Sequence, residues 1–512
     1  YRGRAPPVSS TSPILASLDA ARAYTGGMNQ QAVYERARLS RDARFDGRFF
    51  VGVRTTGIYC RPICPAVSPK SENVTFYPSA AAASEAGYRP CLRCRPECAP
   101  GTPAWGGTST TVRRGLRLIA EGALDDGSIE HLAERLGVTS RHLRRLFSQY
   151  VGASPLAVAH TQRLHFAKRL IDDTDLPMAS VAEAAGYGSV RRFNDTFRKT
   201  YGRTPRELRR RREVPLDSGS ALSVRLPYRK PFDWGAMLTF LGDRATPGVE
   251  QVVDDAYFRV IEIDGRQGII ECRDDDGGSL KLLLHGVGTA AVYSVVQRVR
   301  EMLDLDAPLA DITAVLEADP LLRKLLRRNP GIRVPGSWDG FELLVRAILG
   351  QQVSVKAATT LAGRLAKRYG TKVSMPSSLA HYGSALQLNR SFPTAGKLAR
   401  ARFNNMGLTA ARGATIRLAA AAAANASISF DAVQDPDDFC RSLTALRGIG
   451  DWTAQYVAMR ALKHPDAFPA SDLGIIKALG GDADTMSRAQ SWRPWRAYAA
   501  LLLWSSLSSS GG

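Results

Sequence analysis

The sequence has few cysteines, no long apolar run and no excess of acidic residues. Its seven cysteines are too few to cross-link a chain of 512 residues as a disulfide scaffold. No apolar stretch reaches the length of about 18 residues that a transmembrane helix needs, and the first residues lack the basic-then-apolar pattern of a secretion signal. We therefore expect a cytoplasmic protein without a membrane partner, in which residues 1–27 form a tail.

Positive charge is what the sequence has in excess. Lys and Arg number 69 against 48 Asp and Glu, which gives a formal net charge of +21. Such an imbalance indicates a polyanionic partner, and without a membrane this partner is nucleic acid. At about 150 residues per domain, the length predicts three or four domains.

Five of the seven cysteines lie in one short region. Cys60 and Cys64 form one close pair, Cys91 and Cys94 form a second, and Cys98 follows in a linker-like stretch that makes it a poor ligand candidate. Two such pairs, brought together by a fold, supply four thiolates for one tetrahedral zinc ion. A purely structural zinc site is one interpretation of this pattern.

Arginines next to these cysteines favour a second interpretation. Arg54, Arg61, Arg93 and Arg95 flank the cluster, which suits the approach of a phosphate. Zinc keeps bound sulfur deprotonated at neutral pH, and the thiolate is the nucleophilic form of cysteine. We therefore expect a reactive thiolate close to DNA, with Arg54 and Arg61 among the DNA contacts.

Residues 30–96 resemble the Ada-type methylphosphotriester-repair domain. The matching stretches are Asp46–Phe49 (DGRF), Arg54–Pro62 (RTTGIYCRP), Glu72–Tyr77 (ENVTFY) and Gly87–Cys94 (GYRPCLRC). The resemblance implies that Cys60 irreversibly accepts a methyl group from a methylated DNA phosphate, and that Cys60, Cys64, Cys91 and Cys94 hold the metal. A zinc centre with four thiolates carries a charge of about −2, so methylation of one sulfur would weaken repulsion from DNA and raise affinity.

The middle of the chain is basic and contains two helical hairpins. Residues 112–212 hold 20 Lys and Arg against 11 Asp and Glu. Residues 129–147 and 178–197 each have the pattern helix, glycine turn, helix, with Ser140 or Ser189 as the expected cap of the second helix. Arginines in the first turns of that helix suit contacts with base edges and phosphates. The alternative is an α-hairpin with a solvated basic face.

Together the two hairpins resemble the AraC-type regulatory domain, with its terminal signature at Phe193–Arg209 (FNDTFRKTYGRTPRELR). The resemblance implies sequence-specific binding to double-stranded DNA, and it makes RNA polymerase a candidate partner. The expected DNA contacts are Arg141, Arg144, Arg145, Arg191 and Arg192.

A glycine-containing turn near the C-terminus predicts a helix-hairpin-helix. In residues 446–454 (LRGIGDWTA), Gly448 and Gly450 let the backbone come close to DNA, and the amides of the next helix bind a phosphate. Asp472 lies 20 residues beyond Trp452; by itself it would be interpreted as a helix cap. Hairpin-type DNA glycosylases carry a catalytic Asp at this spacing. One carboxylate there stabilises the cationic sugar as the base leaves, or helps to orient water.

Four aromatic residues accompany this motif: Phe240, Trp452, Tyr456 and Trp495. As a set they predict a slot for a flipped, positively charged alkylated purine, although core packing is the alternative for each one. Trp452 occupies the position where lyase-competent relatives place a lysine. Because an indole cannot form a Schiff base, we expect a monofunctional glycosylase.

Residues 226–507 resemble the AlkA-type 3-methyladenine DNA glycosylase. The matching stretches are Pro227–Phe240 (PYRKPFDWGAMLTF), Arg346–Val355 (RAILGQQVSV) and the hairpin. The resemblance assigns catalysis to Asp472 and the base pocket to the four aromatic residues. It places Gln352 where the family can have a leucine wedge that fills the gap left by the flipped base. It also implies that the carbonyls of Thr444, Leu446 and Ile449 could bind a monovalent cation.

A second methyltransferase site is missing. Many Ada proteins carry a Pro-Cys-His-Arg active site, but the late cysteines Cys272 and Cys440 lie in ECR and FCR contexts. We therefore expect no repair of O-alkylated bases.

These features predict a multidomain α+β protein that combines an alkylation sensor, a DNA-binding regulator and a glycosylase for bases such as 3-methyladenine, as a monomer. Two alternatives stay open: a methylation-triggered regulator with an inactive, DNA-binding tail, and a repair enzyme whose middle domain is only a tether. The expected domains are 1–27 (tail), 28–98 (four-cysteine zinc α/β module), 108–212 (all-α double helix-turn-helix), 218–300 (small β-sheet domain of the glycosylase) and 301–512 (helix-hairpin-helix domain).

Overall fold

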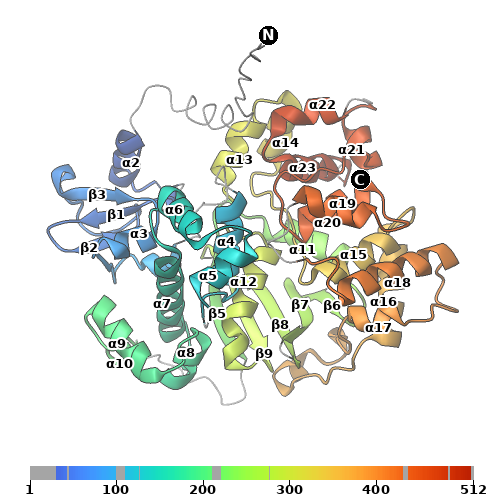
Figure 1. Ribbon diagram of the computed structural model, residues 1–512, viewed down its shortest axis with the longest axis horizontal. Coiled ribbons are helices and arrows are strands. Elements are labelled where there is room, and N and C mark those ends of the chain that lie inside the picture. Colours follow the sequence, from blue (N-terminus) through green and yellow to red (C-terminus); the bar gives the residue numbers. More distant parts are fainter. Residues whose placement is uncertain are drawn as a thin grey trace, which may run out of the picture.

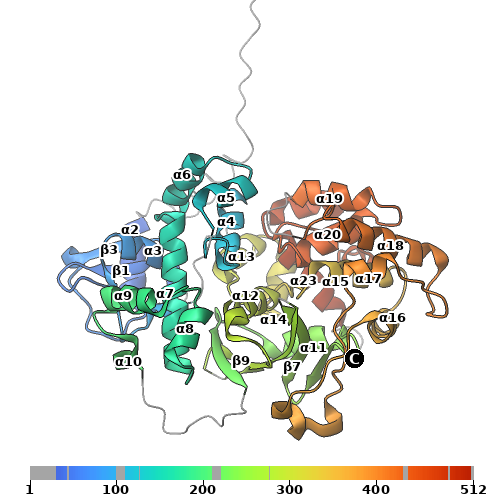
Figure 2. The same cartoon turned by 60° about the horizontal axis from the view of Figure 1, so that its bottom comes forward.

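The computed structural model describes residues 30–42, 45–99, 110–125, 127–209, 221–263, 265–275, 277–430, 436–481 and 485–508. Figure 1 shows three parts in order across the molecule: a cysteine-rich module (residues 30–99), a helical regulator part (110–209) and a C-terminal part (221–508). Figure 2 shows that the regulator part lies between the other two. The expected tail, 1–27, lies outside the described residues.

The cysteine-rich module is a small four-stranded sheet with short helices. Its elements are α2 (Gln30–Leu39), β1 (Phe50–Val53), β2 (Ile58–Cys60), η2 (Ser71–Asn73), β3 (Val74–Tyr77), α3 (Ala80–Glu85), β4 (Arg89–Pro90) and η3 (Pro96–Cys98). The strand order is β3-β1-β2-β4, and β2 and β4 are parallel. Because parallel strands end at the same edge of a sheet, Cys60 and Cys91 come out side by side.

The regulator part contains two helix-turn-helix units joined by one long helix. Its elements are α4 (Thr110–Ala120), α5 (Ile129–Arg135), α6 (Ser140–Val151), α7 (Pro155–Asp173), α8 (Met178–Ala184), α9 (Val190–Tyr201) and α10 (Pro205–Leu208). Ser189 caps α9 as expected, because its hydroxyl accepts from the amide of Arg192. The cap expected at Ser140 is wrong. The hydroxyl of Thr139 accepts from the amide of His142, so Thr139 is the cap and Ser140 is the first residue of α6.

The C-terminal part begins with an antiparallel five-stranded sheet in the order β5-β9-β8-β7-β6. Its elements are β5 (Leu222–Pro227), α11 (Trp234–Asp243), β6 (Glu250–Val253), β7 (Ala256–Ile263), β8 (Arg266–Asp274), β9 (Ser279–His285), η4 (Thr289–Ala291) and α12 (Val292–Met302). Asp233 caps α11, which carries Phe240.

The described residues after α12 form helices joined by loops, as expected. The elements are α13 (Leu309–Leu316), α14 (Pro320–Arg328), α15 (Gly340–Leu349), α16 (Val355–Tyr369), η5 (Ser377–Ala385), α17 (Ala395–Ala399), α18 (Ala410–Ala424), α19 (Pro436–Thr444), α20 (Asp451–Arg460), α21 (Leu473–Ala478), α22 (Thr485–Ala489), η6 (Gln490–Trp492) and α23 (Arg496–Ser508). No helix among the described residues is both long and apolar enough to cross a bilayer.

The regulator part and the C-terminal part share one hydrophobic core. Phe166 and Phe197 of the regulator part belong to the same buried cluster as Leu226 of β5. The rings of Phe166 and Tyr293 of α12 lie with centroids 4.8 Å apart. The two parts are therefore packed directly against each other.

Candidate functional sites

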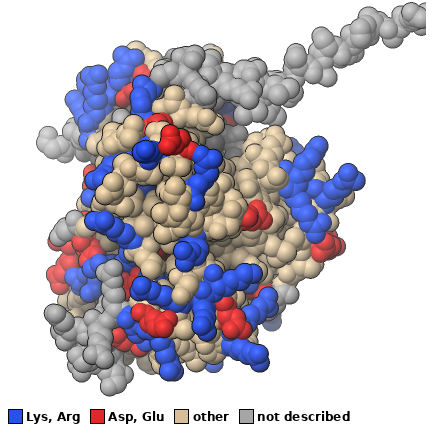
Figure 3. Space-filling view, turned by 90° about the vertical axis from the view of Figure 1, so that its left-hand side faces the viewer, with Lys and Arg blue, Asp and Glu red and all other residues tan. Residues whose placement is uncertain are grey.

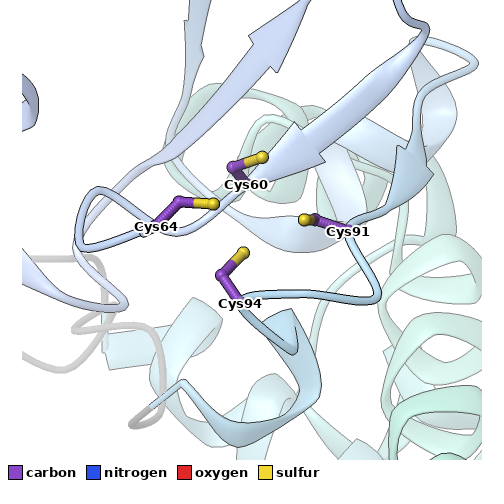
Figure 4. Close-up of side chains that lie close together, drawn as sticks. All are labelled: Cys60, Cys64, Cys91 and Cys94. Atoms are coloured by element: carbon purple, nitrogen blue, oxygen red, sulfur yellow. The ribbon is translucent and has the colours of Figure 1, made fainter. Parts of the chain in front are cut away.

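The four cysteines expected to bind metal converge on one point. The Sγ atoms of Cys60, Cys64, Cys91 and Cys94 all lie within 4.8 Å of one another (Figure 4). Zinc–sulfur bonds of about 2.3 Å in a tetrahedron require sulfurs about 3.8 Å apart, so a small contraction of this cluster fits zinc. Four thiolates are also one of the donor sets that hold zinc in closed, four-coordinate sites.

One sulfur of the cluster accepts a hydrogen bond from a backbone amide: the amide of Arg61 donates to Sγ of Cys94 at 3.3 Å. Among the described residues, no backbone amide donates to the sulfur of Cys60. Amide donors withdraw charge from a thiolate, so the sulfur of Cys60 is more electron-rich than that of Cys94.

The guanidinium of Arg61 is bound within the module. It donates from Nε to Oδ1 of Asp46 at 2.8 Å, from Nη2 to Oδ2 of the same carboxylate, and from Nη1 to the carbonyl of Cys94 at 3.1 Å. A phosphate contact by Arg61 would therefore require this bidentate pair to open. The sequence interpretation did not single out Asp46 as a site residue.

The other arginines near the cluster differ in exposure. Arg54 and Arg93 are exposed, and both are available to a phosphate. Arg95 instead forms an ion pair with Asp172 of α7 at 2.6 Å. Figure 3 shows the side of the molecule that carries this module, where Lys and Arg outnumber Asp and Glu.

Both second helices of the regulator part present arginines to solvent. Arg141, Arg144 and Arg145 are exposed on α6, and Arg191 and Arg192 are exposed at the start of α9. Arg144 pairs with the exposed Glu130 at 3.3 Å, and exposed pairs of this kind are weak. All five candidates are therefore accessible to DNA.

The hairpin between α19 and α20 requires glycine at one of its two candidate positions. Gly448 has φ +91°, and a Cβ there would lie 2.2 Å from Oγ1 of Thr415. Gly450 has φ −96°, and a Cβ added there would have no atom within 4 Å, so its backbone is ordinary. The side-chain amide of Gln351 holds the hairpin. Its Nε2 donates to the carbonyl of Gly448 and to Oγ1 of Thr453, each at 3.1 Å.

Asp472 sits at the start of α21, with both carboxylate oxygens engaged. Oδ2 accepts from Nε1 of Trp452 at 2.8 Å. Oδ1 accepts from Nε1 of Trp504 at 2.9 Å and from the amide of Ile475 at 3.0 Å. Asp472 therefore caps a helix, as expected for an isolated Asp at this position. Two indoles also hold its carboxylate at the aromatic cluster.

The aromatic cluster contains three of the expected members and one substitution. Trp452 and Tyr456 stack with centroids 5.2 Å apart and an angle of 8° between their planes, and Trp504 lies 6.3 Å from Tyr456. Trp495 is a correction: it is 4% exposed and packs on Tyr498 in the helical core. The indole that joins Trp452 and Tyr456 beside Asp472 is Trp504, whereas Trp495 was the expected fourth member of the base pocket.

Phe240 borders the cluster, but cations already cover its ring. The guanidinium of Arg244 lies 4.0 Å from its centroid, and that of Arg460 lies 4.9 Å from it. Arg460 also donates to the hydroxyl of Tyr456. Burial raises the pKa of Tyr456, but the positive charges of Arg460 and Arg244 outweigh this effect and leave that pKa below its ordinary value. The slot is therefore less electron-rich than the aromatic residues alone predict.

Gln352, the expected wedge, is exposed and has φ +56°. Arg412 donates to the carbonyl of the preceding Gln351. An exposed leucine that the sequence interpretation did not single out, Leu473, is 83% exposed directly after Asp472. A polar side chain after α15 and an apolar side chain at the start of α21 are thus both exposed.

Models of three protein families match successive parts of the chain: the metal binding domain of Ada at residues 34–97, a helix-turn-helix domain at 132–211 and the AlkA N-terminal domain at 223–339. A probable bifunctional transcriptional activator/DNA repair enzyme AlkA of Mycobacterium tuberculosis is 42% identical over 482 residues, which are 92% of this chain and 95% of the relative. The chain belongs to this Ada–AlkA fusion family.

Two relatives from Escherichia coli each match one side of the Ada–AlkA fusion. DNA-3-methyladenine glycosylase 2 is 30% identical and covers 54% of this chain and 95% of its own length. The bifunctional transcriptional activator/DNA repair enzyme Ada is 33% identical and covers 33% of this chain and 47% of its own length. Among solved structures, a 3-methyladenine DNA-glycosylase from Archaeoglobus fulgidus is 22% identical, with a TM-score of 0.47 over 55% of this chain and 97% of its own.

Membership of the Ada–AlkA fusion family confirms several expectations. The chain is a multidomain DNA repair protein and transcription regulator of the alkylation response, and it binds zinc and DNA.

One signal in the sequence pointed to Trp504, which the sequence interpretation missed. An indole in an apolar helix needs an acceptor for its N–H, and Asp472 is the acceptor.

Proposed function

We propose that this chain repairs DNA methylphosphotriesters stoichiometrically at Cys60 and releases alkylated bases catalytically at Asp472. One observation carries the second half of the proposal. Two indoles and one backbone amide fix a single carboxylate at the start of α21, beside stacked aromatic rings. A helix cap by itself needs only the amide.

At the cysteine cluster, bound zinc would keep the four sulfurs deprotonated near neutral pH. Sγ of Cys60 then attacks the methyl carbon of the triester, a sulfur–carbon bond forms, and the carbon–oxygen bond breaks with its electron pair going to the phosphate. Arg54 is the exposed cation that would seat the phosphate, with Arg61 available if its pair with Asp46 opens. Cys60 is the proposed nucleophile because the resemblance to the Ada-type domain assigns the acceptor role to the first cysteine of the cluster, and its thiolate is the nucleophilic form.

The regulator part would convert this reaction into a change of DNA binding. Methylation removes about one negative charge from the thiolate centre, so repulsion from DNA phosphates falls. The arginines of α6 and α9 would then hold a defined operator. We propose RNA polymerase as a further partner. We also propose that the protein acts as a monomer and that its domains have the limits given under the sequence analysis.

In the glycosylase reaction, Asp472 would stabilise the positive charge that develops on the sugar as the glycosidic bond breaks. The flipped base would lie against Trp452, Tyr456 and Trp504. Trp452 offers no amine for a Schiff base, so the product would be an abasic site. Bases such as 3-methyladenine suit this arrangement, because alkylation at a ring nitrogen makes the base a good leaving group.

DNA would be held by the hairpin amides of Gly448 and Gly450, with Gln352 in the gap left by the flipped base. A monovalent cation at the carbonyls of Thr444, Leu446 and Ile449 belongs to the same proposal. Such an ion would neutralise carbonyl dipoles that face the phosphate.

The deciding experiment measures the free base released from methylated duplex DNA by the parent and by Asp472→Asn. We expect release of 3-methyladenine by the parent, a loss of release in the variant and similar DNA affinity in both. If both proteins bind the DNA and neither releases base, the C-terminal part is a binding module. The protein would then be a regulator triggered by methylation of Cys60.

A further inference from the structure

We propose that the C-terminal part (residues 221–508, called the glycosylase part below) positions the methyl-acceptor cysteine, and that Arg229 is the positioning residue. This proposal rests on the proposed role of Cys60. Arg229 follows β5 in the C-terminal part, 183 positions from the turn that it contacts. It acts on Cys60 only through intermediate residues.

The contact is made at the turn that precedes β1, residues 45–48. Nη1 of Arg229 donates to the carbonyl of Asp46 at 2.9 Å. Two residues later, Arg48 forms an ion pair with Asp311 of α13 at 2.7 Å. Two groups of the glycosylase part therefore hold one turn of the cysteine-rich module.

That turn is attached to the thiolate cluster by the side chain of Asp46, which is 6% exposed. Its carboxylate receives two parallel bonds from the guanidinium of Arg61, a bidentate arrangement that fixes direction as well as distance. Arg61 follows Cys60 directly, and its amide donates to Sγ of Cys94. A shift of the turn would thus move the residue that adjoins the acceptor.

The residue on the other side of Cys60 is also fixed. The hydroxyl of Tyr59 lies 2.8 Å from Nε2 of His165 on α7, and the ring of Tyr59 is fully buried. Because Tyr59 cannot follow a movement of Arg61, the change in backbone would fall on Cys60 itself. The orientation of its Sγ therefore depends on contacts from both neighbouring parts.

Arg229 is itself held firmly. It is 8% exposed, its amide donates to the carbonyl of Leu305 at 3.1 Å, and its own carbonyl accepts from the guanidinium of Arg333. Arg225, four residues earlier, differs: its side chain is 63% exposed and pairs with Asp275 at 3.0 Å. The two residues offer a matched comparison within one segment of chain.

The test uses the full zinc-loaded chain and duplex DNA that carries a single methylphosphotriester. We expect Arg229→Met to lower the maximal rate of methyl transfer about tenfold, as small misplacements of reacting groups do, with little change in the DNA concentration for half-maximal rate. Arg229→Lys restores a donor and should recover most of the rate. Arg225→Met should match the parent.

A second readout does not depend on transfer. In cobalt-substituted protein, the thiolate-to-metal charge-transfer bands report the geometry of the four sulfurs. We expect Arg229→Met to shift these bands and Arg225→Met to leave them in place. Equal rates and equal spectra for Arg229→Met and the parent would overturn the positioning role.

Two further variants separate the possible failures. Asp311→Asn removes the charge of the partly exposed partner of Arg48, at the second contact with the same turn, so it serves if Arg229→Met does not fold. We expect a smaller fall in rate, and no fall would contradict the proposal. Cys60→Ala addresses the proposed function: transfer that persists in this variant would show that another residue is the acceptor. In that case the cobalt spectra of the Arg229 variants still decide whether the glycosylase part shapes the cluster.

Discussion

Trp504 donates its indole N–H to Oδ1 of Asp472 across 2.9 Å, from the last described helix of the chain. Trp452 donates to the other oxygen from α20. With a donor on each oxygen, the carboxylate cannot rotate freely, and its charge has a fixed direction. Pre-organised charge of this kind stabilises a cationic transition state without reorganisation during the reaction.

Replacing Trp504 should therefore affect catalysis more than folding. Trp504→Phe removes one donor to Asp472 and leaves most of the ring, so we expect single-turnover base release to fall about tenfold, since a hydrogen bond to a charged group contributes about 1.5–3 kcal/mol. Trp495→Phe is the matched change in the buried core and should lower the thermal midpoint while base release stays near the parental rate. A larger loss of release in the Trp495 variant would restore that residue to the base pocket.

The hairpin glycines should differ in their tolerance of a methyl group. Gly448→Ala places a Cβ against Thr415 in a left-handed backbone, which costs about 1–3 kcal/mol. Gly450→Ala meets no atom within 4 Å and has an ordinary φ. In fluorescence titrations with undamaged duplex DNA, we expect the change at Gly448 to weaken binding strongly and the change at Gly450 to have a small effect. Equal losses of affinity in the two variants would mean that the methyl group hinders the approach of DNA to the hairpin amides, and that the backbone conformation at Gly448 does not limit binding.

A partly buried lysine, Lys463, predicts a stability that increases with pH. Burial lowers the pKa of Lys463 to about 7, against the opposing charges of Glu301 and Asp304. Between its ordinary pKa of about 10.4 and this value, the unfolded chain binds a proton that the folded chain does not, so stability is lost as pH falls from 10 toward 7. From pH 7 to pH 9 we expect the parent to gain about 2 kcal/mol relative to Lys463→Met. Thermal midpoints of the two proteins at both pH values test this, and a constant difference would contradict it.

The arginines at the start of α9 should contribute to DNA affinity through phosphates or bases. Arg191→Ala should weaken binding and, if Arg191 contacts a phosphate, reduce the slope of log affinity against log salt by about one. The exposed Arg225 provides the control, because Arg225→Ala removes the same charge from β5. Binding titrations at four salt concentrations distinguish the two variants. An identical slope for Arg191→Ala and the parent would exclude a phosphate contact.

The parts of the sites that the sequence predicts are those that lie close together along the chain. Cys60 and Cys64, Cys91 and Cys94, and the glycines of the hairpin follow from spacing, because a single strand end or turn places each pair. Asp472 follows from its distance to the hairpin. In these cases local geometry leaves few alternatives.

The parts that the sequence does not predict depend on distant packing. Trp495 and Trp504 both lie in apolar surroundings near the C-terminus, and only the orientation of α23 against α21 decides which indole reaches Asp472. The pair between Asp46 and Arg61 depends on the register of β1 against β2. The guanidinium groups over Phe240 come from α20 and from the end of α11, so no single window of sequence contains them.

The common core of the regulator part and the glycosylase part has a consequence for how this protein can be divided. Phe197 and Leu226 lie in one buried cluster, on opposite sides of the segment 210–220. Separating the two halves at that segment would leave apolar side chains of both in water, at a cost of about 25 cal/mol for each Å² exposed. The two halves are therefore not exchangeable cassettes: expressed separately, each would need the other to complete its interior.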